Sequence, residues 1–264
     1  MKILEKVFWL LVNSPFYPHW LNNLKLNSGN KRIEDAIFGN VLEVGAGDGS
    51  RKDKLVEKNK KIERYVATDY STWDLDFENI NKSLDKFGNL FNIIKGYEKR
   101  KPMDTVCSAT ELPFADSSFD SHISFEALEH IDDPYKYFEE AARVTKSGGI
   151  VGFSVPFIFR MHGGEALHKK DFFRFTNGFF YKVAEDNNLE VVEIYNNTGV
   201  GTSVAQMLNH KMILMIEAGN LAIKILLVLI APLYFFANNV LGLIIDVVPD
   251  KRFATRFHII FRKK

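Results

Sequence analysis

The sequence predicts an α/β fold built around a mostly parallel sheet. From Asn40 to about Pro156, short runs rich in β-branched residues alternate with polar stretches of helical length. That alternation is typical of βαβ units. A glycine-rich turn between the first predicted strand and the helix after it supports the same fold, because glycine allows a sharp reversal of the backbone. The 264 residues fit one large domain, or a domain with a substantial appendage.

The amino-terminal half of the sheet is predicted from four apolar runs. A polar stretch after the first run is expected to be a helix, at 50–60. The long polar segment 70–103 is expected to be part helix and part loop. The four strands are expected at 41–45, 65–69, 104–108 and 119–125.

The carboxyl-terminal half begins with a helix expected from Asp133 to Val144. Asp133 is a favourable N-cap, and Pro134 suits the first turn. The pair Gly148-Gly149 is expected to end this helix, so that the fifth strand follows at once. The remaining elements are strands at 150–155, 189–195 and 256–261, and a helix capped by Thr176 that reaches about Asn187.

Composition narrows the class of protein. The formal net charge is only +1, so the chain as a whole lacks the basic character of nucleic-acid binders, and we expect no nucleic-acid partner. A single cysteine, Cys107, excludes an internal disulfide and fits a reducing compartment such as the cytoplasm. No run of residues has the spacing of metal ligands, so no metal is expected.

Residues 1–39 are expected to form an N-terminal helical segment, separate from the main domain at 40–264. The apolar run Val7–Val12 is too short for a secretory signal, and Pro15 and Pro18 are expected to end its helix. Packing against the main domain is one role for this segment. Contact with a membrane surface is the other, because Trp9 and its aromatic neighbours suit an interface.

An apolar stretch at about 207–248 precedes the last predicted strand. Its core, 225–237, is almost wholly apolar, but Lys224, Pro232 and Asn238 interrupt the wider stretch. A membrane-spanning helix needs about 20 apolar residues, so we expect broken helices instead. They could form a lid over a substrate site, a peripheral membrane contact, or a hairpin packed on its own domain.

The glycine-rich turn is the strongest local signal. Gly45, Ala46 and Gly47 follow a buried strand, and Glu43 near its end can organise the turn. Asp69 lies 20 residues after Gly49, where a carboxylate can accept hydrogen bonds from both hydroxyls of a ribose. A purely structural turn is the simpler alternative. A dinucleotide site is disfavoured, because its third glycine would fall on Ser50.

Three further segments resemble class I S-adenosylmethionine-dependent methyltransferases of the type 11 group. They are 108–120 (SATELPFADSSFD), 125–134 (FEALEHIDDP) and 143–149 (RVTKSGG), in the family's order. The resemblance implies a Rossmann-like, doubly wound sheet of seven strands with the last strand antiparallel, and here an apolar helical insertion before that strand. It also implies S-adenosylmethionine as the cofactor, bound across the strand ends.

The resemblance assigns cofactor contacts residue by residue. Ser108 stands where the family often has an aspartate that accepts from the adenine amino group, and a serine makes a weaker acceptor. Ala109 would offer a backbone amide, and Tyr70 would cover an adenine face. The full set of expected cofactor residues is Glu43, Gly45, Ala46, Gly47, Asp69, Tyr70, Ser108, Ala109 and Phe125.

A narrower resemblance concerns 168–176 (HKKDFFRFT), which is similar to a segment of methyltransferases encoded near bacterial polysaccharide and glycolipid genes. It implies a hydroxyl on a glycan, a lipid-linked molecule or another small molecule as acceptor. His168 with Asp171 is the expected acid–base pair. Alternatively, Asp171 pairs with Arg174 and only holds the loop. The wider alternatives are an inactive cofactor-binding scaffold and a methyltransferase for a soluble metabolite. The expected location is the cytoplasm, with peripheral contact at the inner face of the membrane left open.

Overall fold

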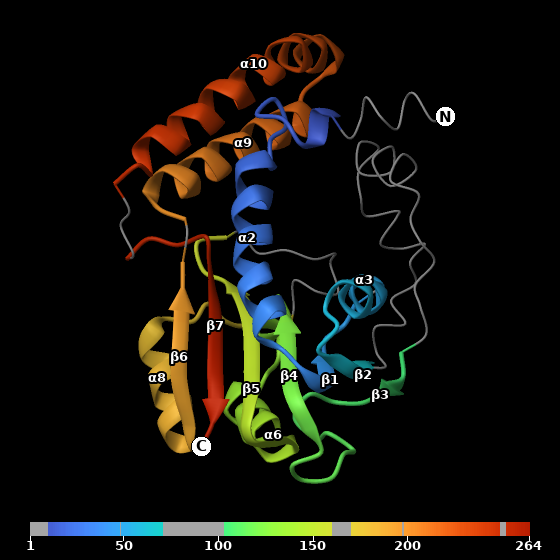
Figure 1. Cartoon of the computed structure of the whole chain (residues 1–264). Coiled ribbons are helices and arrows are strands. Elements are labelled where there is room, and N and C mark those ends of the chain that lie inside the picture. Colours follow the sequence, from blue (N-terminus) through green and yellow to red (C-terminus); the bar gives the residue numbers. More distant parts are fainter. Residues whose placement is uncertain (1–9, 48, 71–102, 160–169, 197, 249–251) are drawn as a thin grey trace. The chain divides into compact units, whose positions relative to one another are not determined.

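The computed structural model describes residues 10–47, 49–70, 103–159, 170–196, 198–248 and 252–264. These residues contain a seven-stranded sheet with the order β3-β2-β1-β4-β5-β7-β6 (Figure 1). The strand order reverses between β1 and β4, which is the topological switch point where α/β proteins bind ligands. The predicted Rossmann-like, doubly wound fold is therefore confirmed.

Strands β1 to β5 pair in parallel, and β7 lies antiparallel between β5 and β6. The predicted antiparallel last strand is confirmed. Strands β4 and β6 have the predicted bounds, whereas β3 is much shorter than 104–108. The strands are β1 Gly39–Val44, β2 Ile62–Asp69, β3 Thr105–Val106, β4 Phe119–Phe125, β5 Thr145–Pro156, β6 Leu189–Tyr195 and β7 Arg256–Lys263.

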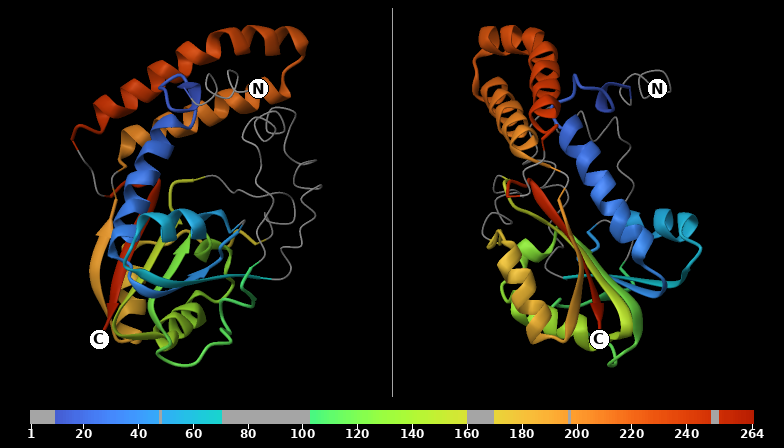
Figure 2. Two further views of the ribbon diagram at one scale, coloured as in Figure 1. Left: turned by 45° about the vertical axis from the view of Figure 1, so that its right-hand side comes forward. Right: turned by 60° about the vertical axis from the view of Figure 1, so that its left-hand side comes forward.

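The helices of the sheet cover both of its faces. In the right-hand view of Figure 2, α6 and α8 lie on one face, and α3 lies on the other with the carboxyl-terminal part of α2. The bounds are α2 Trp20–Ala36, α3 Ser50–Lys58, α6 Pro134–Val144, α8 Asn177–Asp186 and the short 3₁₀ helix η2 Leu128–His130. Most of the segment 70–103 lies outside the described residues.

The expected cap and the expected last residue of α6 are both confirmed, but the expected stop signal is wrong. The Asp133 side chain accepts a hydrogen bond from the Lys136 amide at 2.9 Å. The helix ends at Val144, and β5 begins at once because Thr145 adopts an extended backbone. Gly148 therefore lies inside the strand with φ +78°, not at the end of the helix. The β-branched Thr145 pairs with Phe119 of β4, and this tertiary pairing overrides the local glycine signal.

Two compact units make up the chain. The larger contains the sheet, its helices and α2 from Gly29, and the smaller contains residues 10–28 and the chain between Asn196 and Thr255. The division at residue 39 stays a prediction. In the larger unit, buried aromatic rings of α6, α8, β5 and β7 pack together, including Phe138, Phe153, Phe180 and Phe261.

The smaller unit is built around two helices, α9 Val200–Ala218 and α10 Leu221–Ile245. They run side by side in both views of Figure 2. The expected helical insertion is confirmed, but the expectation of a short, broken α10 is wrong. The chain turns at Gly219 and Asn220, and α10 continues for 25 residues through Pro232. Asp246 connects the end of α10 to the start of α9. Its carboxylate accepts hydrogen bonds from the amides of Gly201 and Thr202 at 2.7 and 2.9 Å.

Candidate functional site

A cavity of about 510 Å³ lies at the carboxyl ends of β1, β2 and β4. Six of the nine predicted cofactor residues line it: Gly45, Gly47, Asp69, Tyr70, Ser108 and Ala109. The other lining residues are Val44, Cys107, Thr110, Glu126, Ala127, His130, Ile131, Asp132, Lys170 and Phe172. The size and the mixed polar and apolar wall suit a small organic ligand.

The glycine turn needs glycine for two different reasons. Gly45 and Gly47 have φ of +73° and +60°, in the left-handed region that side chains disfavour. A Cβ on Gly45 would lie 2.5 Å from the Cβ of Ala127, the residue just before η2. Glycine at position 45 therefore lets the turn pack closely against Ala127. A Cβ on Gly47 would meet nothing within 4 Å, and Gly47 lines the cavity. Because residue 47 has no side chain, the backbone of the turn is open to the cavity at this position.

Asp69 connects the end of β2 to this turn. One carboxylate oxygen accepts from the Gly47 amide at 2.6 Å, and the other accepts from the Tyr70 amide at 2.7 Å. The residue is 8% exposed and lines the cavity. Asp69 can therefore stabilise the turn and still offer lone pairs to ligand hydroxyls, since each carboxylate oxygen accepts more than one bond.

We expect Asp69→Ala to weaken the binding of S-adenosylmethionine roughly tenfold to a hundredfold, because hydrogen bonds to a charged group contribute about 1.5–3 kcal/mol. Isothermal titration measures the loss, and circular dichroism checks the fold. Asp69→Asn is the matched control, since its amide oxygen can still accept from the Gly47 amide and it should lose less affinity. A folded Asp69→Ala protein with unchanged affinity would refute the assignment.

Ser108 and its neighbours form the wall expected to face an adenine ring. The Ser108 hydroxyl lies 2.8 Å from the Thr110 hydroxyl and accepts from the Thr110 amide at 3.2 Å. Tyr70 is 44% exposed, and the Lys170 ammonium lies 5.4 Å from the centre of its ring. A backbone hydrogen bond attaches this wall to the end of β2: the Cys107 amide donates to the Asp69 carbonyl at 3.0 Å.

Cys107 falls within the strand expected at 104–108, but the observed strand ends before it. It is half-buried, follows β3 and lines the cavity. Burial raises the pKa of its thiol above the ordinary value, so the thiol stays protonated at neutral pH.

The other three predicted cofactor residues, Glu43, Ala46 and Phe125, do not line the cavity. They make contacts beneath its lining that support the glycine turn. Glu43 is 2% exposed and accepts from the Tyr65 hydroxyl at 2.7 Å, and its other oxygen lies 3.3 Å from the Arg51 guanidinium. That guanidinium sits 3.8 Å from the ring centre of Phe125. Ala46 is buried, and its amide donates to the Thr68 carbonyl of β2 at 3.0 Å. These contacts order the floor of the site.

Glu126 is a wall residue that the sequence did not single out. Its φ of +51° is unusual for a residue with a side chain. One carboxylate oxygen accepts from the Ser154 hydroxyl at 2.8 Å, and the other lies 3.5 Å from the buried Arg256 guanidinium. No local pattern signals this backbone conformation, which depends on partners from β5 and β7.

The end of β4 is also tied to the segment that follows residue 169. The Glu129 carbonyl accepts from the Phe172 and Phe173 amides at 2.9 and 3.3 Å, and His130 Nδ1 lies 2.9 Å from the Lys170 carbonyl. The Glu129 side chain is fully buried. Burial, with the nearby charge of Glu126, raises the pKa of Glu129 to about 8, so the carboxyl is mostly protonated at neutral pH.

The predicted acid–base pair is only partly visible. His168 lies outside the described residues, so its role stays a prediction. The Asp171 side chain is fully buried and does not line the cavity. Both of its oxygens pair with the Arg174 guanidinium, one of them at 2.8 Å. The alternative geometry, in which Asp171 pairs with Arg174, is the one present. No cluster of three or more potential metal ligands occurs in the described part of the chain.

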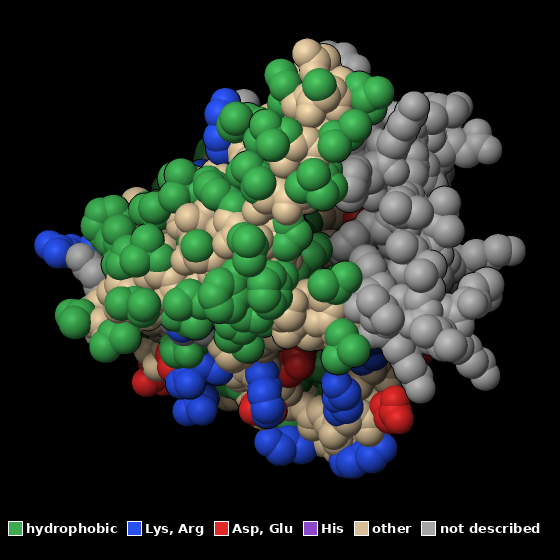
Figure 3. Space-filling view, turned by 90° about the horizontal axis from the view of Figure 1, so that it is seen from above, with side chains coloured by type: hydrophobic (Ala, Val, Ile, Leu, Met, Phe, Trp, Pro, Cys, Tyr) green, Lys and Arg blue, Asp and Glu red, His purple; other side chains and the backbone are tan. Residues whose placement is uncertain are grey.

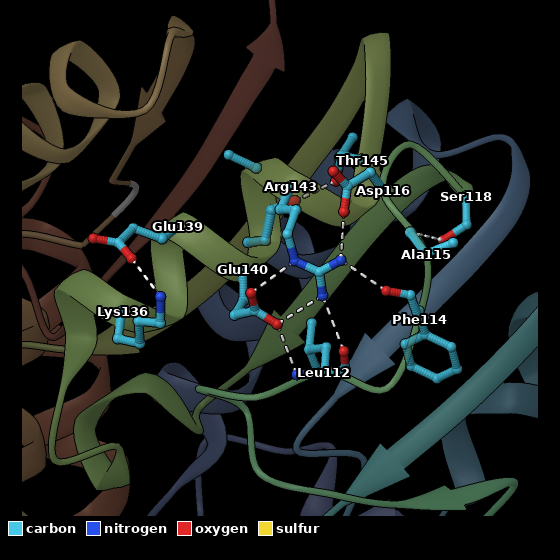
Figure 4. A network of polar contacts seen from close by, with 12 residues as sticks. Leu112, Phe114, Ala115, Asp116, Ser118, Lys136, Glu139, Glu140, Arg143 and Thr145 are labelled. Carbon is cyan, nitrogen blue, oxygen red and sulfur yellow. Dashed lines mark hydrogen bonds and ion pairs between the residues drawn. The ribbon is translucent and has the colours of Figure 1, made fainter.

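A second polar network fixes the loop that follows Ser108 (Figure 4). Arg143 of α6 donates to the carbonyls of Leu112 and Phe114 at 2.9 and 2.7 Å, and it pairs with Asp116 at 2.8 Å. Glu140, one helical turn earlier, accepts from Arg143 at 2.8 Å and from the Leu112 amide at 2.7 Å. The network closes the 112–116 loop against α6.

Comparison with known proteins finds a similar domain. Residues 42–153, which contain the glycine turn and most of the cavity wall, match a family model described as a methyltransferase domain. Over residues 42–153 the chain is therefore similar to methyltransferases, in agreement with the resemblance found in the sequence.

Among curated relatives, the chain is 34% identical over 124 residues to the demethylmenaquinone methyltransferase of Paenarthrobacter aurescens, which covers 45% of this chain and 40% of the relative. It is 30% identical over 147 residues to the ubiquinone biosynthesis O-methyltransferase of Nitrosomonas europaea, with 55% and 56% covered. The chain spans about half the length of the curated relatives it matches.

Two solved structures share the fold at low identity. Phosphoethanolamine N-methyltransferase 2 of Haemonchus contortus, solved with S-adenosyl-L-methionine, has a TM-score of 0.51 and 15% identity over 96% of this chain and 59% of its own. A putative sarcosine dimethylglycine methyltransferase of Galdieria sulphuraria has a TM-score of 0.50 and 17% identity, with 94% and 85% covered. These likenesses support the fold alone.

Proposed function

We propose that the protein is an S-adenosylmethionine-dependent methyltransferase that methylates a hydroxyl of a small-molecule acceptor. The observation that carries this proposal is the bare glycine turn, held by Asp69, at the edge of a cavity inside the matched domain. A Cβ at position 47 would project into open space, and this is the fit expected if a ligand lies against the backbone there.

When bound, the cofactor supplies a methyl group that is already activated for in-line displacement. The chain then has to orient the cofactor, position the acceptor and exclude water. Asp69 would hold the ribose hydroxyls, and Tyr70, Ser108 and Ala109 would enclose the adenine. Glu126, His130 and Lys170 also line the cavity, and Lys170 belongs to the segment after β5. The acceptor would enter near this segment.

The acceptor class is proposed from two sources. The segment 168–176 favours a glycan or a lipid-linked acceptor. The names of the two curated relatives favour an acceptor from quinone biosynthesis.

A single experiment separates these acceptor classes. Binding of S-adenosylmethionine is first measured by titration. The protein is then incubated with labelled cofactor and, in separate reactions, a soluble sugar, a lipid-linked sugar, a demethylated quinone or a catechol. Release of S-adenosylhomocysteine with labelled product supports turnover, whereas binding without product with every acceptor would indicate a scaffold.

We expect His168→Ala to lower the turnover rate about a hundredfold while cofactor affinity stays nearly constant, because the residue is proposed as general base on the acceptor side. Turnover against pH and isothermal titration measure the two effects. Asp171→Asn is the comparison, since it breaks the pair with Arg174 and should reduce stability and rate together. Equal losses of affinity and rate in His168→Ala would show that this histidine only supports the loop.

The proposed location is the cytoplasm, with peripheral contact at the inner face of the membrane. The lone cysteine fits a reducing compartment. Helix α10 is long and apolar enough to meet a membrane.

A further inference from the structure

Helix α10 exposes most of its apolar surface. Its most apolar 18-residue window has a mean hydropathy of 2.1, yet only 17% of that window is buried. Leu226, Leu229, Leu233 and Ile244 are 59%, 73%, 70% and 62% exposed. Seen from above, hydrophobic side chains gather along the α9–α10 hairpin (Figure 3). Exposed apolar surface on this scale marks an interaction site in a folded protein.

Two ordinary explanations of such a helix do not fit. The core helix of a globular protein is mostly buried, and α10 is mostly exposed. A signal sequence lies near the N-terminus, and α10 occupies Leu221–Ile245 of 264 residues. Among the described residues, the chain's own core does not cover this surface, so its partner lies outside them.

The distribution of exposed residues around α10 identifies that partner. Leu227, Ala231 and Phe235 form a narrow buried stripe. At roughly 100° per residue, Leu229 and Leu233 fall on the side opposite this stripe, while Ile225 and Phe236 fall on one flank and Ile230 and Leu241 on the other. All six are exposed. A second copy of the chain would cover one side, whereas a lipid phase surrounds all three.

The same hairpin carries polar features that argue against a crossing helix. Asn239 of α10 donates to the carbonyls of Pro15 and Tyr17 at 2.7 and 3.0 Å. If α10 crossed a bilayer, this non-helical backbone would lie at the depth of the hydrocarbon, where irregular backbone next to lipid is excluded. Lys211, in the middle of α9, is exposed and would also be immersed.

We propose that α10, with the exposed apolar side of α9, lies in the plane of a lipid bilayer and anchors the protein to one leaflet. Apolar side chains on three sides of α10 enter the acyl boundary by about 5–10 Å. Lys211 and Lys224 extend their ammonium groups back to the headgroups. This inference rests on the proposed membrane contact and is independent of methyl transfer. It would give the enzyme access to an acceptor dissolved in that leaflet.

Flotation with vesicles of phosphatidylethanolamine and phosphatidylglycerol tests the binding surface on the full chain. The wild-type protein should float with the vesicles, and the double variant Leu229→Glu/Leu233→Glu should lose at least about tenfold in bound fraction. The pair Leu226→Glu/Ile244→Glu repeats the test with independent residues. The matched control is Val56→Glu/Tyr181→Glu, which adds equal charge at exposed apolar positions of α3 and α8 and should float like wild type.

The orientation is tested by thiol labelling in a Cys107→Ala background. Leu221→Cys and Val247→Cys place one thiol at each end of α10, at positions 75% and 76% exposed. A membrane-impermeant maleimide added outside the vesicles should label both ends. Protection of one end would show a crossing helix and overturn the in-plane proposal.

Three other results would overturn lipid binding itself: wild-type protein that does not float, equal loss in the control variant, or a lipid-independent dimer that the glutamate variants dissociate. None of these outcomes depends on whether methyl transfer is detected, so the two proposals fail separately.

Discussion

The Gly47→Val variant is expected to show no measurable binding of S-adenosylmethionine, a loss of at least about a hundredfold in affinity. Position 47 lines the cavity, and a Cβ there would project into open space. The branched valine side chain would fill the room that the cofactor is proposed to occupy. The substitution also strains the backbone, because φ at position 47 is +60°.

Gly148→Val separates obstruction from strain. Gly148 has φ +78°, a Cβ there would also meet nothing within 4 Å, and the residue does not line the cavity. Both variants should lose about 1–3 kcal/mol of stability from backbone strain, but only Gly47→Val should lose binding. Thermal melts and isothermal titration give the two quantities. If Gly47→Val is folded and binds normally, the glycine turn is structural and the proposed ligand position is wrong.

The second large effect concerns stability. Arg143→Ala should lower the free energy of unfolding by about 2–3 kcal/mol, because hydrogen bonds to charged groups are worth about 1.5–3 kcal/mol each and partial exposure reduces their sum. The variant removes the donors to the Leu112 and Phe114 carbonyls and the partner of Glu140. The 112–116 loop loses its tie to α6, so cofactor binding at the nearby Ser108 wall should weaken as well.

The pH dependence of unfolding tests the Arg143 network independently. The Arg143 hydrogen bond and the Leu112 amide hold the pKa of Glu140 below its ordinary value in spite of burial. A carboxyl whose folded pKa is lowered stabilises the protein above its unfolded pKa, and the contribution is lost as pH falls through the folded pKa. Urea unfolding between pH 7 and 3 should therefore show a smaller acid-dependent loss in Arg143→Ala.

Lys136→Ala is the control for this experiment. Lys136 pairs with Glu139 on the exposed side of the same helix, at 2.7 Å (Figure 4). Exposed pairs contribute little, so both stability and its pH dependence should stay close to wild type. Similar behaviour of the two variants would contradict a structural role for the Arg143 network.

The sequence alone predicted the architecture and the glycine turn beside which the cavity lies. Period-two and apolar patterns are local, and they located β4 and β6 with their observed bounds. The side chain of Asp133 bonds three residues along the chain, so its cap could be read directly. The glycine turn and Asp69 could be placed together because parallel strands end at one edge of a sheet.

Tertiary structure decided which polar groups meet and which residues face the cavity. Glu43 and Phe125 support the turn because Tyr65 and Arg51, distant in sequence, reach them. The positive φ of Glu126 depends on β5 and β7, and no local pattern encodes it. Helix α10 likewise continues through Pro232, because packing of its buried stripe on α9 stabilises the helix across that residue. Local sequence specifies backbone preference, whereas the meeting of distant side chains is fixed only when the chain has folded.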